Sequence, residues 1–322
     1  MKTRLLTSVG FLFVLIMAII LKVFVSNYFM DALILLITCF ASYEASKILS
    51  KMGKFNDKTM AILFPCFSML VLLFGLAYDS TLGILLTIGI VVSLIVVFFG
   101  ITFLISFLMP NTKFELKTRK LDMHLTKSRY SLIKALNTTI LFVYPGFLLL
   151  FLTLINHIED LTTSIPSVAG FNGNLSLIII LFALLIPIFT DTFAYITGGL
   201  FGGKKLAPKI SPNKTISGAV GGFLWCILLS VMTYYILYSI PSVANILNAT
   251  GFAVWKLIII VMIGSVLSQL GDLFESWLKR KANVKYSWNS LPCHGGMLDR
   301  FDSYIFVAPY LFIAFSILFA VI

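Results

Sequence analysis

Long apolar runs separated by short polar segments dominate the pattern of the chain. A helix that crosses a bilayer core needs about 20 apolar residues. Nine segments meet that requirement: residues 5–25, 29–49, 60–78, 81–108, 136–155, 175–198, 219–240, 253–278 and 303–322. The pattern therefore predicts an all-α integral membrane protein with about nine transmembrane helices. The first run is too long for a signal peptide and lacks a small-x-small cleavage site, so we expect a retained span.

Lysine and arginine are distributed unevenly between the two ends of the predicted helices. If the N-terminus lies inside, all 24 basic residues except Lys22 and Lys256 fall in or beside the inner segments. Basic segments close to membrane spans stay on the cytoplasmic side. The distribution therefore predicts a cytoplasmic N-terminus and a C-terminus outside, and it supports the count of nine.

Composition agrees with this assignment and excludes other classes. The chain is 59% hydrophobic and 11% charged, with a mean hydropathy of +1.02, whereas soluble domains carry about 25% charged residues. The net charge of +11 is not gathered on a solvated domain, so we expect no nucleic-acid partner. The four cysteines lack paired spacing, which excludes a disulfide framework or a zinc site.

The chain divides into two predicted regions. Residues 1–135 form an N-terminal helical membrane region with a basic cytosolic loop at 110–135, and residues 136–322 form a C-terminal membrane region that carries the candidate catalytic residues. The loop mixes seven basic residues with acidic and apolar ones. It is either an interfacial amphipathic segment that gathers anionic lipid or an ordinary solvated positive-inside loop.

Ionisable residues within a span are costly and indicate function. The eighth predicted span has Asp272, Glu275, Ser276 and Lys279 at positions i, i+3, i+4 and i+7, on one helix face. The stripe contains two carboxylates, a hydroxyl and an ammonium group. It predicts a polar site at the inner end of this span, and the alternative is a salt-bridge cluster at a helix end.

The segment before the ninth span adds two more carboxylates. Asp299 and Asp302 lie at i and i+3 and face the inner end of span eight. Together with Asp272 they predict a site for Mg²⁺, alone or with a second cation, because hard cations prefer oxygen ligands. Gly295 and Gly296 would let the backbone approach a phosphate closely.

The segment that follows the sixth span supplies positive charge. Asp191 lies one turn past Pro187, where we expect the helix to open and line a polar cavity. Groups suited to a triphosphate follow: Lys204, Lys205, Lys209, Ser211, Lys214 and Thr215. The spacing is not that of a Walker A loop. An ordinary positive-inside loop with glycine turns is the alternative.

These segments resemble a known family, the CDP-diacylglycerol synthases or phosphatidate cytidylyltransferases. The resemblance is carried by SWLKRKANVKYSWNSLPCHGGMLDRFD at 276–302, by DTFAYITGG at 191–199 and by KISPNKTISGAVGG at 209–222. Glu44 resembles a glutamate near the end of an early family helix. The chain departs from the family pattern at Ser217, Tyr286, Trp288 and Cys293.

The resemblance implies transfer of CMP from CTP to phosphatidate, giving CDP-diacylglycerol and pyrophosphate for phospholipid synthesis. It implies a catalytic role for Asp272, Lys279, Arg280, His294 and Asp299. The implied substrate-binding residues are Asp191, Ser211, Lys214, Thr215, Gly295, Gly296 and Arg300, and the implied metal ligands are Asp272, Ser276, Asp299 and Asp302.

The resemblance also implies a bacterial-type cytoplasmic (inner) membrane, an active site that faces the cytosol, and CTP and bilayer phosphatidate as partners, with a homodimer left open. Three alternatives remain from the sequence. One is a CTP-dependent lipid (prenol) kinase, which uses the same cations but transfers the γ-phosphate. The others are a degenerate, non-catalytic family member and a transporter, since intramembrane carboxylates also mark ion paths.

Overall fold

The computed structural model describes residues 2–78, 84–110, 126–161, 174–287 and 295–320. Its first helices are α1 (Lys2–Phe24), α2 (Tyr28–Lys51), α3 (Lys58–Tyr78) and α4 (Ile84–Phe107). A long interrupted helix follows: α6 (Lys127–Leu141), the π-helical segment η1 (Phe142–Phe147) and α7 (Leu148–Asn156). The remaining long helices are α9 (Asn174–Phe201), α10 (Ile216–Tyr238), α12 (Val254–Lys281) and α13 (Leu298–Ala320).

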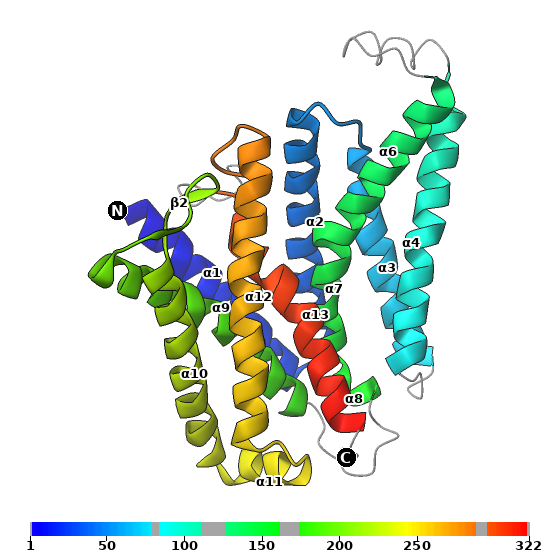
Figure 1. Ribbon diagram of the computed structural model, residues 1–322. Coiled ribbons are helices and arrows are strands. Elements are labelled where there is room, and N and C mark those ends of the chain that lie inside the picture. Colours follow the sequence, from blue (N-terminus) through cyan, green and yellow to red (C-terminus); the bar gives the residue numbers. More distant parts are fainter. Residues whose placement is uncertain (1, 79–83, 111–125, 162–173, 288–294, 321–322) are drawn as a thin grey trace.

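Short elements connect the long helices. They are α8 (Ile158–Leu161), α11 (Pro241–Ala249) and an antiparallel two-stranded sheet of β1 (Lys205–Ala207) and β2 (Ser211–Thr215). The long helices run up and down the bundle, with the hairpin at one end and α11 at the other (Figure 1). The largest helix contacts join α9 to α10 and α12 to α13.

The predicted all-α membrane fold is confirmed. Within the described part of the chain, seven helices are long and apolar enough to cross a membrane. Every predicted span overlaps one long helix. The count of nine stays a prediction, because the described apolar stretches of α1 and α4 cover only Phe13–Phe24 and Val92–Phe107.

The bundle places the basic segments at one end. That end contains the C-terminal end of α2, the hairpin and the last turn of α12 (Figure 1). Helix α1 begins on the same side, and α13 ends on the opposite side. Lys51, Lys214 and Lys281 therefore share one end of the molecule. This arrangement has the alternation that the charge pattern predicted, and which end faces the cytoplasm stays a prediction.

The predicted basic loop at 110–135 is wrong over its last third, residues 127–135. Helix α6 begins at Lys127, where the Thr126 side chain caps the helix by accepting from the Arg129 N–H. Lys134 is buried within the helix, and its ammonium group pairs with Asp57 at 2.7 Å. The sequence placed Lys134 in a solvated loop because its buried partner lies far away in the chain. Residues 111–125 lie outside the described residues.

The predicted opening of the sixth span at Pro187 is also wrong. Helix α9 runs without a break from Asn174 to Phe201, with Pro187 inside it. The interruption lies instead in η1, where Tyr144, directly before Pro145, has φ −116° and ψ 116°. A proline removes one helical hydrogen bond, and packing by neighbouring helices decides whether the helix opens there.

A buried polar cluster ties α1, α2 and α7 together at the end opposite the hairpin. The Asp31 carboxylate accepts from Asn156 Nδ2 at 2.8 Å and lies 2.7 Å from His157 Nε2. Lys22 donates to Asn156 Oδ1 at 2.6 Å, and Asp160 lies 2.8 Å from His157 Nδ1. Asp31 is a carboxylate within the second predicted span. The cluster explains its presence structurally, because both of its carboxylate oxygens have partners.

His157 predicts how stability depends on pH. Burial alone would lower the pKa of this imidazole, but hydrogen bonds with Asp160 and Asp31 raise it to about 9. A folded-state pKa above the unfolded value means that the protonated ring stabilises the fold below about pH 6.5, and that this contribution is lost as pH rises through 9. We expect the unfolding temperature in detergent to fall between pH 7 and pH 10.

The His157→Gln variant is the control for this titration. It lacks the titrating ring, so its unfolding temperature should be lower at pH 7 and should depend less on pH over the same range. An equal pH dependence in the two proteins would show that His157 is not the group that titrates.

Candidate functional site

A close contact between α12 and α13 creates the centre of the site. A Cβ added at Gly271 would lie 2.6 Å from the backbone oxygen of Asp302, so only glycine allows this approach. The contact brings Asp272, the next residue on α12, beside Asp302 on α13. Helix α9 adds Asp191, whose Oδ2 accepts from Ser303 Oγ at 3.3 Å.

Three carboxylates, those of Asp191, Asp272 and Asp302, therefore gather between α9, α12 and α13. Asp302 is only 8% exposed, and its charge is opposed by the charges of Asp272 and Asp191. The Asp191 side chain remains reachable from the surface although many protein atoms surround it. Two like charges beside the buried Asp302 are costly, so this carboxylate cluster favours compensation by cations.

Lys214 on β2 supplies part of that compensation. Its ammonium group forms an ion pair with the Asp272 carboxylate, and Ser276 Oγ donates to Asp272 Oδ1 at 3.3 Å. The segment after the sixth predicted span and the inner end of the eighth are therefore in direct contact. Lys214 pairs with only one of the three carboxylates, so acidic groups outnumber the paired basic groups in the cluster.

The donor chemistry of the carboxylate cluster fits a hard divalent cation such as Mg²⁺, which prefers carboxylate and hydroxyl oxygens. Within the described part of the chain, however, no three side chains of Asp, Glu, His or Cys are placed closely enough to enclose a metal ion. The magnesium site stays a prediction.

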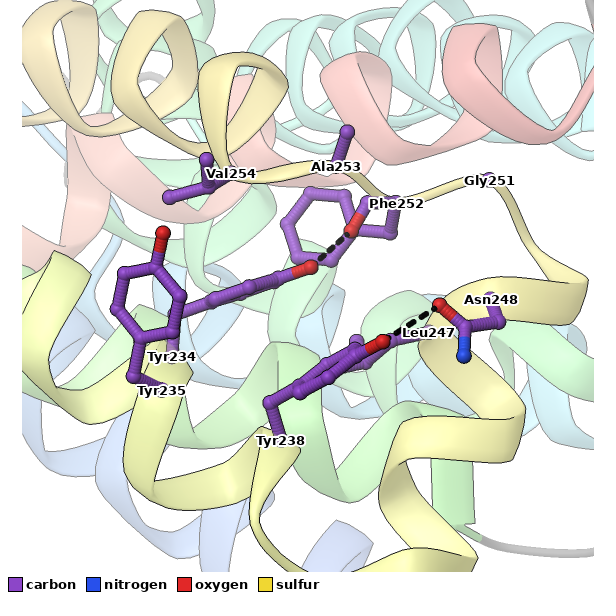
Figure 2. A pocket seen from close by; sticks show the side chains of 9 residues that line it. All are labelled: Tyr234, Tyr235, Tyr238, Leu247, Asn248, Gly251, Phe252, Ala253 and Val254. Atoms are coloured by element: carbon purple, nitrogen blue, oxygen red, sulfur yellow. Dashed lines mark hydrogen bonds between the residues drawn. The ribbon is translucent and has the colours of Figure 1, made fainter.

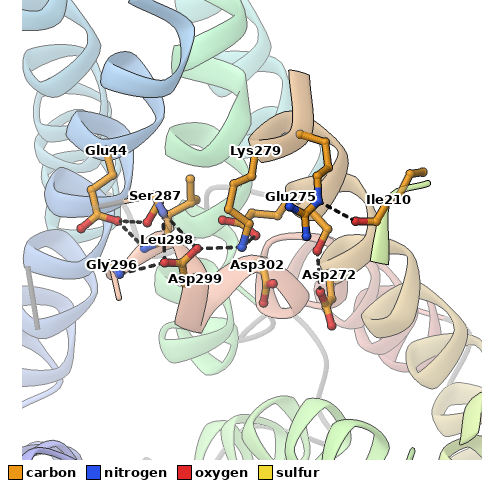
Figure 3. A network of polar contacts seen from close by, with 12 residues as sticks. Glu44, Ile210, Asp272, Glu275, Lys279, Ser287, Gly296, Leu298, Asp299 and Asp302 are labelled. Atoms are coloured by element: carbon orange, nitrogen blue, oxygen red, sulfur yellow. Dashed lines mark hydrogen bonds and ion pairs between the residues drawn. The ribbon is translucent and has the colours of Figure 1, made fainter. Parts of the chain in front are cut away.

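Asp299 belongs to a second network, one turn toward the start of α13 (Figure 3). Its carboxylate accepts from Lys279 Nζ at 2.8 Å, from Gly296 N at 2.9 Å and from Ser287 N at 3.1 Å. Lys279 also pairs with Glu275, whose side chain is fully buried. Lys279 thus bridges two carboxylates, and Asp299 is engaged by protein groups where the sequence predicted a metal ligand.

Glu44 of α2 holds the start of α13. Its side chain is fully buried and accepts from Ser287 Oγ at 2.8 Å, Met297 N at 2.9 Å and Leu298 N at 2.8 Å (Figure 3). The first N–H groups of a helix lack partners within the helix, and a carboxylate is favourable there. Glu44 therefore works as a cap supplied by a distant helix.

The absence of side chains at Gly295 and Gly296 has a structural explanation that differs from the predicted phosphate contact. A Cβ at Gly296 would lie 1.9 Å from Ser287 Oγ and 2.2 Å from Glu44 Oε2. Gly295 has a φ of +83°, and a Cβ there would lie 2.6 Å from Asp299 Oδ2. The two glycines give Glu44 and Asp299 room to reach the backbone.

Gly296→Ala should therefore destabilise the protein. The added methyl group must push Glu44 or Ser287 out of its hydrogen bonds, and overpacking of this kind costs about 1–3 kcal/mol. Thermal unfolding in detergent would measure the loss. Gly199→Ala is the matched control, because a Cβ at Gly199 meets nothing within 4 Å. Equal unfolding temperatures for the two variants would contradict the close approach.

A cavity of about 300 Å³ opens beside this network. Four cationic side chains and one carboxylate are among its lining residues, which are Ser276, Lys279, Arg280, Lys285, Tyr286, Asp299 and Arg300. Such an excess of positive charge suits a polyanion such as a triphosphate. Five predicted site residues line the cavity, namely Ser276, Lys279, Arg280, Asp299 and Arg300.

The hairpin is tied to the end of α12 by Arg280, whose Nε donates to the Ile210 oxygen at 3.0 Å. Ser211 begins β2, and Thr215 ends it. The Thr215 hydroxyl caps α10 by accepting from Gly218 N at 3.1 Å, which is a structural task that the sequence analysis did not predict. Predicted phosphate contacts of Ser211 and Thr215 stay untested, and His294 lies outside the described residues.

Sequence reasoning left several neighbours out of the predicted site. Glu275 entered the sequence analysis only through the salt-bridge alternative for the α12 stripe, and it is the buried partner of Lys279. Lys285 and Tyr286 line the cavity, and Ser287 bonds both Glu44 and Asp299. The sequence signal that could have pointed to Glu44 is its position as a carboxylate within an otherwise apolar span.

A second cavity, of about 420 Å³, lies at the opposite end between α10, α11 and the start of α12 (Figure 2). Tyr234, Tyr235 and Tyr238 line it, and none of its lining residues is charged. Tyr234 donates to the Phe252 oxygen at 2.8 Å. Tyrosines at a helix end are typical of a membrane interface. The larger cavity therefore lacks the charge that a polyanion requires, and the smaller one has it.

Comparisons with known proteins agree with the resemblance in the motifs. Residues 2–318 match the cytidylyltransferase family. The phosphatidate cytidylyltransferase of Staphylococcus saprophyticus is 50% identical over 132 residues, which are 41% of this chain and 46% of that protein. The enzymes of that name from Staphylococcus epidermidis and Staphylococcus aureus are each 48% identical over 132 residues, with the same two shares. The matched segment thus spans just under half the length of these curated relatives.

Proposed function

The chain belongs to the cytidylyltransferase family, and on that premise we propose that it transfers CMP from CTP to phosphatidate in the membrane. The products are CDP-diacylglycerol and pyrophosphate. The observation that carries the proposal is the cationic cavity beside the carboxylate cluster of Asp191, Asp272 and Asp302. The names of the staphylococcal relatives support the choice of lipid substrate.

The reaction is a displacement at phosphorus. An oxygen of the phosphatidate phosphate attacks the α-phosphorus of CTP, the bond from that phosphorus to the bridging oxygen breaks, and pyrophosphate leaves with the electron pair. A phosphate monoester is already largely ionised near pH 7, so no general base is required. The protein's task is to position two anions and to neutralise their charge.

The cationic side chains would divide this task. Lys279 lines the cavity and is held by Glu275 and Asp299, so it would contact a phosphate at a fixed position. Arg280 and Arg300 would hold the outer phosphates at the cavity rim. Lys214, paired with Asp272, would bring positive charge from the hairpin to the same reacting centre.

The carboxylate cluster of Asp191, Asp272 and Asp302, with Ser276, would hold Mg²⁺, which supplies charge neutralisation at the phosphates when it is bound. The negative charges of Asp191, Asp272 and Asp302 oppose one another, which a bound cation would relieve. Asp299 would instead orient Lys279 and the segment before α13, since its carboxylate bonds to both.

The location at one end of the bundle suits both substrates. The acyl chains of phosphatidate remain in the bilayer, while CTP and pyrophosphate move through water. The basic end of the bundle is the cytosolic end in this proposal, and the bacterial relatives support an inner membrane location.

The test uses the full-length purified chain with CTP labelled on the α-phosphorus, Mg²⁺ and phosphatidate in detergent micelles. We expect labelled CDP-diacylglycerol and stoichiometric pyrophosphate. Release of labelled CDP together with an unlabelled phosphorylated lipid would favour the lipid kinase instead. No turnover of CTP with any phospholipid or prenol would support a non-catalytic member.

A further inference from the structure

Tyr286 is the single aromatic residue among the side chains that line the cationic cavity. Its side chain is 52% exposed, whereas the neighbouring Ser287 is 2% exposed. An exposed ring at the rim of a polyanion cavity calls for an explanation, because the phosphates themselves do not require it. Tyr286 is also one of the positions where the chain departs from the family pattern.

The ring is held at the cavity by its neighbours in the chain. Ser287 is fixed by its N–H donating to Asp299 and its hydroxyl donating to Glu44. Gly295 approaches the ring so closely that a Cβ there would lie 3.2 Å from Tyr286 Cδ1. The Lys285 ammonium group lies 5.5 Å from the ring centroid. Tyr286 therefore keeps its place beside the cations without being buried.

The cations do not distinguish a nucleotide from an inorganic polyphosphate, because both present the same phosphate oxygens. Recognition of the nucleoside needs a group that contacts the base. A pyrimidine ring stacks on an exposed aromatic face. A nearby cation adds a cation–π attraction to the aromatic ring. The ring of Tyr286 offers such a face next to the groups that would bind the phosphates.

We propose that Tyr286 binds the base of the incoming nucleotide by stacking, so that the cationic cavity prefers a pyrimidine nucleoside triphosphate over inorganic polyphosphate. The inference rests on the proposed function for the identity of the nucleotide. An alternative is that Tyr286 anchors the chain at the membrane interface, as tyrosines often do. The two explanations predict different binding behaviour.

The experiment measures binding of CTP and of tripolyphosphate to the full-length chain by calorimetry in detergent. For Tyr286→Leu we expect affinity for CTP to fall roughly tenfold, which is typical of losing one base stack, and affinity for tripolyphosphate to stay within about twofold. Tyr286→Trp should recover the affinity for CTP that Tyr286→Leu loses. Tyr238→Leu, in the uncharged cavity at the opposite end, is the matched control and should bind both ligands as the unaltered protein does.

Two outcomes would overturn the stacking inference. Equal losses of affinity for CTP and tripolyphosphate would show that Tyr286 shapes the cationic cavity. Unchanged affinity for both would assign Tyr286 to the membrane interface. Failure of the proposed function has a separate signature. In that case the unaltered protein would bind tripolyphosphate but would not bind or turn over CTP.

Discussion

Asp272→Asn is expected to reduce CTP turnover on the order of a hundredfold or more, a size typical for loss of one preorganised charged group at a reacting phosphate. The fold should survive the change. Asp272→Asn gives up an ion pair with Lys214 in which both side chains are partly exposed. It also removes a charge that opposes those of Asp302 and Asp191, and we expect this relief at least to offset the lost pair. The unfolding temperature should be equal to or higher than that of the unaltered protein.

The combination of lost activity and retained stability distinguishes a catalytic role of Asp272 from a structural one. Radiolabelled product formation gives the activity, and thermal unfolding in the same detergent gives the stability. Asp160→Asn, which alters an acidic residue at the opposite end of the bundle, is the control and should remain active. Near-normal turnover by Asp272→Asn would remove Asp272 from the proposed reaction.

Asp299→Asn should differ from Asp272→Asn in a way that the sequence did not suggest. The family resemblance implies the same roles for Asp272 and Asp299, as catalytic residues and metal ligands, so it predicts the same effect for both variants. The Asp299 carboxylate accepts from Lys279 and from the backbone of Ser287 and Gly296. Its loss should therefore lower stability as well as activity, because a buried donor is left without its partner.

The sequence was most informative where structure depends on near neighbours. Hydropathy located the long helices, because the bilayer imposes one length on all of them. The stripe on α12 was placed correctly because residues three and four apart share a helix face. Ser276 does bond Asp272, and Lys279 does bond Glu275 and Asp299.

The sequence was least informative about partners from distant segments. Glu44 contacts Ser287 across 243 positions of sequence, and no periodicity encodes which helix will lie beside which. Gly295 and Gly296 were linked to a phosphate, because a glycine pair allows any close approach, and the structure assigns that space to Asp299 and Glu44. Lys134 was placed in a loop for the same reason, since its partner Asp57 is 77 positions away.

The sign of the charge was predicted better than its arrangement. Asp272, Asp299 and Asp302 were expected to converge on one site, and the structure divides them between two networks. Asp302 and Asp272 share the carboxylate cluster with Asp191, and Asp299 pairs with Lys279. Positions i and i+3 place Asp299 and Asp302 on similar faces, but one turn of α13 separates them far enough to meet different neighbours.

Lys279→Met is expected to abolish activity and also to destabilise the protein, by about 3–5 kcal/mol, because removing one member of a buried ion pair leaves its partners uncompensated. Glu275 is fully buried, and the Asp299 side chain is 10% exposed. Thermal unfolding and labelled product formation are the measurements. Lys281→Met, two residues further on and outside the cavity lining, is the matched control. It should keep full activity and lose at most about 1 kcal/mol, from its cation–π contact with Trp277. A Lys279→Met protein as stable as the unaltered one would contradict a stabilising role for the ion pairs of Lys279 with Glu275 and Asp299.

A second variant separates the two roles of Lys279. In Lys279→Met combined with Glu275→Gln, the fully buried carboxylate becomes neutral, so much of the lost stability should return. Activity should not return, because the ammonium group that faces the cavity is still absent. Recovery of stability alone would show that Glu275 serves to hold Lys279, while the lysine serves the substrate. Recovery of both would mean that Lys279 acts only through the fold, and the phosphate contact proposed for it would have to be assigned to Arg280 or Arg300.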